Sequence, residues 1–246
     1  MSVLLKASVG EIAVSRPHAT ELFDGVGIDY VCHGNLSLHD ACAEAGVDPV
    51  EIRRSLDELP RDDRHKNWLE QPIRELIDFL RAKRHAALST AMAHAVEVLH
   101  SPCEKCGRHP QELAAIRSEF AGLVSVMRPH VSREERVLFP IIEHLDDCWS
   151  RGEAPTLNLS SGLAPAVNAL MLDHGVMMTT LNTIRAVADD LMAREDRCEQ
   201  LGAALRTFDR EFRQHVHLEN NVLYPRAVAL EAVVCHDMLP KAGTSA

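Results

Sequence analysis

The chain has 246 residues, with 36 acidic against 26 basic side chains and a formal net charge of −10. A chain of this length can bury a sizeable core and can form one domain with a small appended unit. The acidic balance lacks the positive field that phosphate-backbone binding requires, so nucleic acid is not expected as a partner.

Apolar positions recur at three- and four-residue intervals through most of the chain, and aromatic residues make up only 4% of it. This spacing predicts an all-α protein. Residues 1–60 are predicted to form a small unit of short helices, in which Ser37 and Asp48 are suited to cap helix N-termini. The helices predicted in this unit are Gly10–Val14, Pro17–Phe23, Ser37–Glu44 and Pro49–Leu59.

A polar stretch then predicts a linker over residues 61–69. Residues 70–235 carry four long helical patterns, which predict a four-helix bundle, and residues 236–246 are predicted to form a C-terminal tail. The four long helices are predicted at Pro72–Leu99, Pro110–Leu145, Ala164–Met192 and Asp196–Val234.

Apolar runs between charged residues are only a few residues long, and the N-terminus shows no signal-peptide pattern. We therefore expect a cytoplasmic protein with no membrane partner. The seven cysteines are scattered, which suits a reducing compartment. Cys103 and Cys106, in Cys-x-x-Cys spacing, are candidates for a metal or redox pair, with an ordinary polar loop as the simpler interpretation. Cys32, in a turn near Gly34, is the better candidate for a reactive thiol.

Two eleven-residue stretches share one pattern: histidine, three residues, glutamate, three residues, leucine, an aromatic residue and proline. The first contains His130 and Glu134, and the second contains His215 and Glu219, 85 positions later. Residues four apart lie one turn above each other on a helix, with β-carbons about 6 Å apart. Each stretch therefore offers an imidazole and a carboxylate to one point in space.

Each of these helices follows another helix that carries a candidate histidine. His85 lies 45 positions before His130, and His174 lies 41 positions before His215. Two antiparallel helix pairs with this spacing would bring four histidines and two glutamates to a similar depth in the core, as cofactor sites in bundles are made.

The predicted donor set is four imidazoles and two carboxylates. If both carboxylates bridge, two metal ions receive about four protein donors each. Nitrogen and oxygen donors without thiolate suit iron, with zinc, manganese or copper as alternatives. The remaining positive charge favours an oxo or hydroxo bridge, and the open positions suit dioxygen or nitric oxide. We therefore predict two non-haem iron ions.

A single His and Glu four apart on an acidic helix is commonly a solvated pair. Two copies with the same downstream leucine, aromatic residue and proline favour the metal site instead. Pro140 and Pro225 are predicted to kink or end their helices just past the ligands. Four further histidines are assigned by default to surface or supporting positions: His94, His100, His144 and His217.

These motifs resemble the di-iron proteins of iron-sulfur cluster repair, the ScdA-type branch of the hemerythrin-like bundles. The resemblance covers nearly the whole chain. In the bundle it rests on the two repeats and on the dipeptides Arg84-His85 and Asp173-His174. In the N-terminal unit it rests on residues 9–12, 28–30, 32, 34 and 37–38.

The resemblance implies that His85 and His130 bind one iron, that His174 and His215 bind the other, and that Glu134 and Glu219 bridge them. It implies protection or restoration of iron-sulfur clusters after nitrosative or oxidative stress, through iron supply or through nitric oxide binding or reduction. Iron-sulfur proteins would be the targets. Whether the site turns nitric oxide over as an enzyme stays open, as does formation of a homodimer. The alternative is a hemerythrin-like protein that binds or senses O2 or NO without turnover.

Two positions depart from the family pattern. Relatives commonly carry adjacent cysteines after the Asp-Tyr pair, whereas this chain has Cys32 alone, between Val31 and His33. Asp173 stands where relatives often have Glu, and it is a candidate for a proton-handling carboxylate beside the ligand His174. A ferritin-like oxidase is disfavoured because that class uses Glu-x-x-His spacing with more carboxylates.

Overall fold

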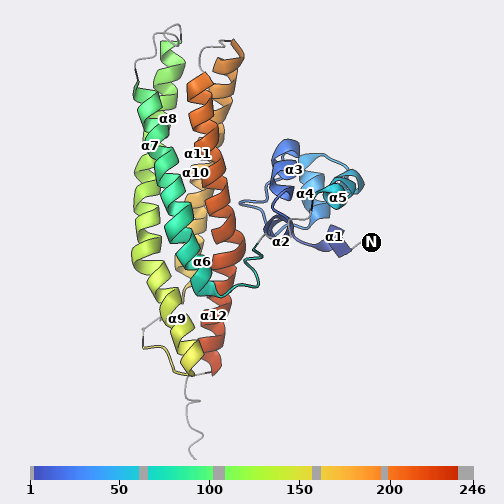
Figure 1. The fold of residues 1–246 in the computed structure, drawn as a ribbon, viewed down its shortest axis with the longest axis vertical. Coiled ribbons are helices and arrows are strands. Elements are labelled where there is room, and N and C mark those ends of the chain that lie inside the picture. The colour runs from blue at the N-terminus through green and yellow to red at the C-terminus, as the bar shows by residue number, and fades with distance from the viewer. Residues whose placement is uncertain (1–2, 61–65, 102–108, 157–161, 195–198, 238–246) are drawn as a thin grey trace, which may run out of the picture.

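Helices form every regular element that this computed structural model describes, which covers residues 3–60, 66–101, 109–156, 162–194 and 199–237. No strand occurs among these residues, and the predicted all-α class is confirmed. Figure 1 shows a long bundle of helices with a small helical unit beside its middle. No helix in the described part of the chain is long and apolar enough to cross a membrane.

The N-terminal unit contains five short helices, one more than the sequence predicted. The additional helix, α1, is a single turn of four residues. Ser37 and Asp48 cap α4 and α5 as expected, because their side chains accept hydrogen bonds from the backbone N–H groups of Asp40 and Val50. The helices are α1 (Val3–Lys6), α2 (Val9–Ser15), α3 (Ala19–Val26), α4 (Leu38–Ala45) and α5 (Pro49–Glu58).

Four rods form the bundle, and three of them change from α-helix to π-helix part-way along. The first rod is α6 (Ile73–Phe79), η1 (Leu80–His85) and α7 (Ala86–His100). The second is α8 (Pro110–Arg133), η2 (Glu134–Leu138) and α9 (Phe139–Arg151). The third is α10 (Ala164–Arg194), and the fourth is α11 (Glu199–Leu218), η4 (Glu219–Leu223) and α12 (Tyr224–Asp237).

The prolines of the two repeats do not end their rods. In each rod a π-helical turn precedes the proline, and an α-helix resumes with the proline in its first turn. At these turns the N–H groups of Phe139 and Tyr224 donate to the carbonyls of Glu134 and Glu219, five residues back. The predicted helix end at each proline is therefore wrong, because the rod continues there through a change of helix type. Such π turns are often found at functional sites.

The core is divided into two apolar clusters along the bundle. One cluster runs from α7, α8, α10 and α11 into the N-terminal unit and includes Phe120, Phe208 and Phe212. The other lies around α6, α9 and α12 and includes Phe139 and Tyr224. The polar residues described below lie at the level where the two clusters meet.

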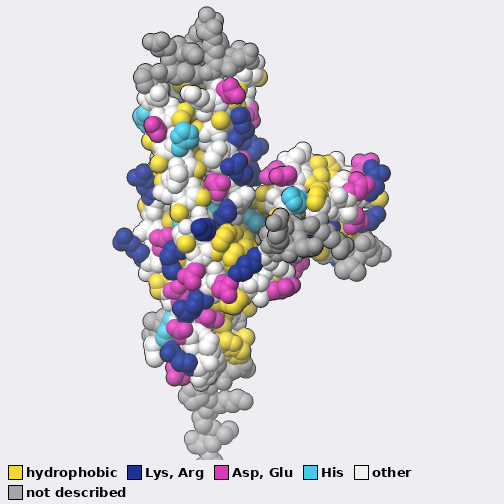
Figure 2. Space-filling view, in the orientation of Figure 1, with side chains coloured by type: hydrophobic (Ala, Val, Ile, Leu, Met, Phe, Trp, Pro, Cys, Tyr) yellow, Lys and Arg dark blue, Asp and Glu magenta, His cyan; other side chains and the backbone are white. Residues whose placement is uncertain are grey.

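The surface of the bundle mixes charges of both signs. On the face drawn in Figure 2, basic and acidic side chains are interspersed along the helices and do not gather by sign. Many ion pairs of the bundle join residues one turn apart or on neighbouring rods, as Arg74 does with Asp147. This face therefore carries no broad region of a single charge.

Candidate metal centre

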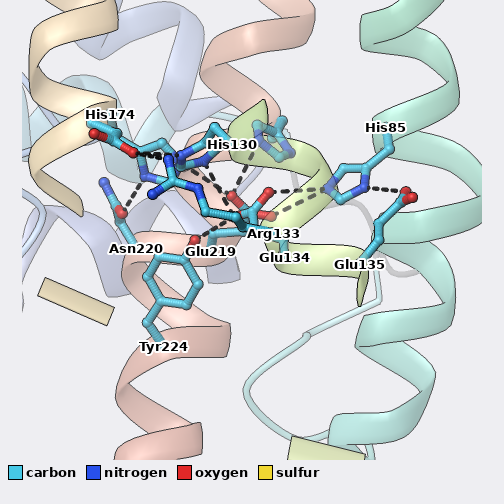
Figure 3. Close-up of polar contacts among 11 residues, drawn as sticks. His85, His130, Arg133, Glu134, Glu135, His174, Glu219, Asn220 and Tyr224 are labelled. Carbon is cyan, nitrogen blue, oxygen red and sulfur yellow. Dashed lines mark hydrogen bonds and ion pairs between the residues drawn. The ribbon is translucent and has the colours of Figure 1, made fainter. Parts of the chain in front are cut away.

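The structure brings all six predicted ligand side chains together inside the bundle (Figure 3). Their positions follow from the π turns, since His85 ends η1 while Glu134 and Glu219 open η2 and η4. The other three histidines come from α8, α10 and α11. All six are buried, with no more than 5% of any residue exposed: His85, His130, Glu134, His174, His215 and Glu219.

Donor atoms of five of these residues lie within 4.8 Å of one another, the exception being His85. Its Nε2 is nevertheless 3.4 Å from an oxygen of Glu219 and 3.7 Å from an oxygen of Glu134. Nε2 of His130 lies 3.3 Å from Glu134, and Nε2 of His215 lies 3.1 Å from Glu219. The imidazoles thus surround the two carboxylates.

The histidines approach in different pairs from those that the resemblance implied. Nε2 of His130 is 2.8 Å from Nε2 of His174, and the rings of His85 and His215 have centroids 4.9 Å apart. Ligand nitrogens about 2.1 Å from one metal lie about 3 Å apart in neighbouring positions. The reason is packing, because α8 lies against α10 and α7 lies against α11. This geometry favours His130 with His174 on one ion and His85 with His215 on the other.

The donor set fits metal cations. Buried polar groups normally have hydrogen-bond partners, yet one oxygen of Glu134 and one of Glu219 are fully buried with no hydrogen-bond partner among the described residues. Each lies within ion-pair distance of imidazole nitrogens. Cations between the carboxylates and the imidazoles would satisfy both oxygens, and oxygen with nitrogen donors suits iron.

Burial and the neighbouring charges shift the pKa values of these groups. Burial alone would lower the pKa of His85, but Glu219 and Glu134 outweigh it and raise this pKa to about 9. Burial, together with Glu219, raises the pKa of Glu134. Burial lowers the pKa of His215 to about 3. Because ligating imidazoles must be unprotonated, a metal that binds His85 displaces its proton.

Three of the four imidazoles have a polar side chain within hydrogen-bond distance of Nδ1, the ring nitrogen that faces away from the two buried carboxylates. Glu135 lies 2.7 Å from Nδ1 of His85, and Asp173 lies 3.4 Å from Nδ1 of His130. Nδ1 of His174 is 2.8 Å from the amide oxygen of Asn220. A partner on Nδ1 leaves the Nε2 lone pair free to face a metal. Asp173 therefore supports His130 on the neighbouring rod.

The aromatic residues of the two repeats stack on imidazoles of candidate ligands on other rods. Phe139 stacks on His85 with ring centroids 5.6 Å apart, and Tyr224 stacks on His174 at 5.9 Å. The Tyr224 hydroxyl also donates a hydrogen bond to Glu134. Burial, with the charges of Glu219 and Glu134, raises the pKa of Tyr224 well above its usual value, so it stays a donor.

We expect Tyr224→Phe to bind metal about tenfold to a hundredfold more weakly, because the change removes the donor that orients Glu134 and keeps the ring on His174. Titration against a competing chelator measures the affinity. Tyr30→Phe, which removes a hydroxyl bonded to Asp24 in the N-terminal unit, is the matched control. Equal affinities for Tyr224→Phe and the unmodified protein would show that the hydroxyl does not support the ligand.

Sequence reasoning missed Glu135, Asn220 and Tyr224 as parts of the site. A signal was present, since Glu135 and Asn220 occupy the same position in the two repeats, one residue after the ligand glutamate. His217, assigned by default to a surface or supporting position, is only 6% exposed and packs edge-on against Tyr30 of the N-terminal unit. The surface alternative is therefore wrong, because helical periodicity alone does not show what covers a helix.

Of the three cysteine candidates the structure describes Cys32, which is not among the residues whose donor atoms approach one another at the site. Cys103 and Cys106 fall outside the residues that the structure describes. Cys32 lies in the segment held by Asp29, whose side chain accepts the N–H groups of Val31 and Cys32. Burial, reinforced by the Asp29 charge, raises the pKa of Cys32 to about 12. This environment disfavours the thiolate that reactivity requires.

Alkylation of Cys32 by iodoacetamide at pH 8 is accordingly expected to be about a thousandfold slower than that of an unfolded cysteine, as a pKa near 12 implies. Mass spectrometry of the Cys32 peptide gives the rate. Because the thiolate fraction grows with pH up to the pKa, the rate should rise about tenfold per pH unit above pH 8. A rate equal to that in denaturant would contradict the burial of this thiol.

Comparison with known proteins accounts for both parts of the chain. Residues 5–60 match the ScdA N-terminal domain, a domain of unknown function, and residues 165–238 match the hemerythrin HHE cation-binding domain. Proteins named iron-sulfur cluster repair protein YtfE align over most of their length. The one from Edwardsiella ictaluri is 29% identical over 89% of this chain and 96% of its own. The one from Musicola paradisiaca is 27% identical over 92% and 97%. The chain therefore combines an ScdA-type N-terminal domain with a hemerythrin HHE domain.

The hemerythrin match spans only the second helix pair, which carries His174, His215 and Glu219. The first helix pair, which carries His85 and Glu134, lies outside this match. These two residues are assigned to the site because Glu134 belongs to the internal repeat and because both side chains lie close to the other four. The N-terminal match ends at residue 60, two residues after α5 ends at Glu58 and directly before the predicted linker.

Proposed function

We propose that the protein holds two non-haem iron ions between its four rods and uses them in the cytoplasm to protect or repair iron-sulfur clusters damaged by nitrosative or oxidative stress. One observation carries the proposal: four buried imidazoles surround two buried carboxylates, each with an oxygen that lacks a hydrogen-bond partner. The cluster-repair names of the relatives supply the biological direction.

The residues that would hold iron have distinct tasks. His130 with His174 and His85 with His215 would each supply two nitrogens, while Glu134 and Glu219 lie between the pairs and would bridge them. Bound iron would supply Lewis acidity and electron transfer toward small diatomic ligands such as nitric oxide or dioxygen. The Tyr224 hydroxyl would orient Glu134, and the stacked ring of Phe139 would hold the imidazole of His85 in place.

The experiment that tests cluster repair uses a purified [4Fe–4S] dehydratase whose cluster has been damaged with nitric oxide. Iron-loaded protein is expected to restore dehydratase activity, and metal-free protein is not. A free ferrous salt at the same iron concentration is the control for simple iron supply. Failure of the iron-loaded protein to exceed this control would overturn the repair proposal.

A measurement of nitric oxide turnover distinguishes reduction of the gas from binding without turnover. Under anaerobic conditions with an electron donor, repeated formation of nitrous oxide would support nitric oxide reduction. Uptake of nitric oxide that stops at a fixed ratio to the iron would support the hemerythrin-like alternative, in which the protein binds or senses the gas without turnover. Gas chromatography distinguishes these outcomes.

A further inference from the structure

The N-terminal unit contacts the bundle through two consecutive asparagines of η4. The side-chain amide of Asn220 donates to the backbone carbonyl of Val31 at 3.1 Å, and that of Asn221 donates to the carbonyl of Tyr30 at 2.9 Å. We call this pair of hydrogen bonds the asparagine latch. It joins residues about 190 positions apart, and it lies immediately after the ligand Glu219.

The amide oxygen of Asn220 contacts His174, one of the candidate metal ligands. This oxygen, Oδ1, is 2.8 Å from Nδ1 of His174 (Figure 3). A backbone carbonyl can only accept a hydrogen bond, so the atom of Asn220 that faces Val31 must be the amide nitrogen. The oxygen is therefore directed at His174, and Nδ1 of that ring must carry the proton. This tautomer leaves Nε2 free for a metal.

The equivalent position in the first repeat shows why an amide matters here. Glu135 holds Nδ1 of His85 with a carboxylate, which is an acceptor in any orientation and needs no other group to direct it. An asparagine amide can present either its oxygen or its nitrogen. Only the contact with Val31 selects the oxygen for His174, so this one imidazole depends on a contact with the N-terminal unit.

We propose that Asn220 is a positioning residue through which docking of the N-terminal unit sets the metal affinity of His174. The inference rests on the proposed metal centre. With the unit docked, the latch holds His174 ready for metal. With the unit displaced, the amide of Asn220 is free to turn, and the ion held by His174 binds more weakly.

Gly34 gives a way to displace the unit without changing the bundle. A β-carbon at this position would lie 1.9 Å from the side chain of Asn221 and 2.8 Å from the carbonyl oxygen of Tyr30. Gly34→Val therefore has to push the latch apart. Cys32 reports the displacement, because it lies beside Val31, and Arg213 of the bundle acts on its ionisation.

The test is a double-mutant cycle on the full chain, read by stepwise Zn²⁺ titration against a chromophoric chelator. Gly34→Val and Asn220→Ala are each expected to weaken one of the two binding steps about tenfold to a hundredfold. The double variant is expected to bind Zn²⁺ no more weakly than Asn220→Ala alone, because both substitutions remove the same connection between the N-terminal unit and His174. Glu135→Ala is the matched control, and its effect should add to that of Gly34→Val.

The outcomes separate clearly. Independent, additive effects of Gly34→Val and Asn220→Ala would overturn the inference. So would a Gly34→Val protein in which Cys32 alkylation speeds up while both binding steps stay as in the unmodified protein. Unchanged alkylation and unchanged binding would show that the unit does not dock through this latch. If the unmodified protein binds no Zn²⁺ tightly, the metal centre itself is refuted.

Discussion

The double variant His130→Ala with His215→Ala is expected to retain little iron after purification under iron-replete conditions. One imidazole is lost from each pair, and each loss also leaves a carboxylate without its neighbour on the same helix, since Glu134 and Glu219 lie four residues further on. The unmodified protein is expected to hold close to two irons per chain. Elemental analysis against protein concentration gives both values.

A matched control replaces two histidines that the structure places on the surface. His94 and His100 are exposed on α7, on the same rod as His85 but outside the site. His94→Ala with His100→Ala should keep the full iron content. If the His130 and His215 double variant keeps the same stoichiometry as this control, the assignment of the ligands is wrong.

Removal of the metal is the second change with a large expected effect. Metal that binds only the folded state at a thousandfold above its Kd contributes about 4 kcal/mol per ion. Loss of two ions should then lower the Tm of this chain by about 15 °C or more. The physical reason is that the metal-free bundle keeps two carboxylates buried, each with an unpaired oxygen.

Circular dichroism at 222 nm, followed during heating, compares the chelated protein with the same sample after reloading. The His130→Ala and His215→Ala double variant provides the control, because adding or removing iron should leave its unfolding curve unchanged. Coincident curves for the chelated and reloaded unmodified protein would mean that this bundle does not depend on a bound ion.

The clustering of these side chains was predictable because four of the six candidate ligands lie in a repeat. A His and a Glu four apart reach the same point on any helix, so local geometry alone places them, and the duplication indicates which pairs matter. The caps Ser37 and Asp48 were predictable for the same local reason. Four of the six candidate ligands could therefore be named from local geometry, whereas His85 and His174 were named from the spacing of the helix pairs and from the family resemblance.

The features that the sequence did not show depend on packing between rods. Which histidines approach each other is decided by the contacts of α8 with α10 and of α7 with α11. The role of Asn220 arises from a contact with Val31, 189 positions away. The burial of His217 arises from Tyr30 in the same way. No local pattern encodes such long-range neighbours.

The wide turns at η2 and η4 have a consequence for the angular phase of the rods. A regular α-helix advances about 100° per residue, so residues five apart point about 140° away from each other. Glu134 and Phe139 are five apart, as are Glu219 and Tyr224, yet all four are fully buried. The extra residue in each turn resets the rotation of the rod. One rod can thereby direct a carboxylate inward and, one turn later, an aromatic ring inward as well.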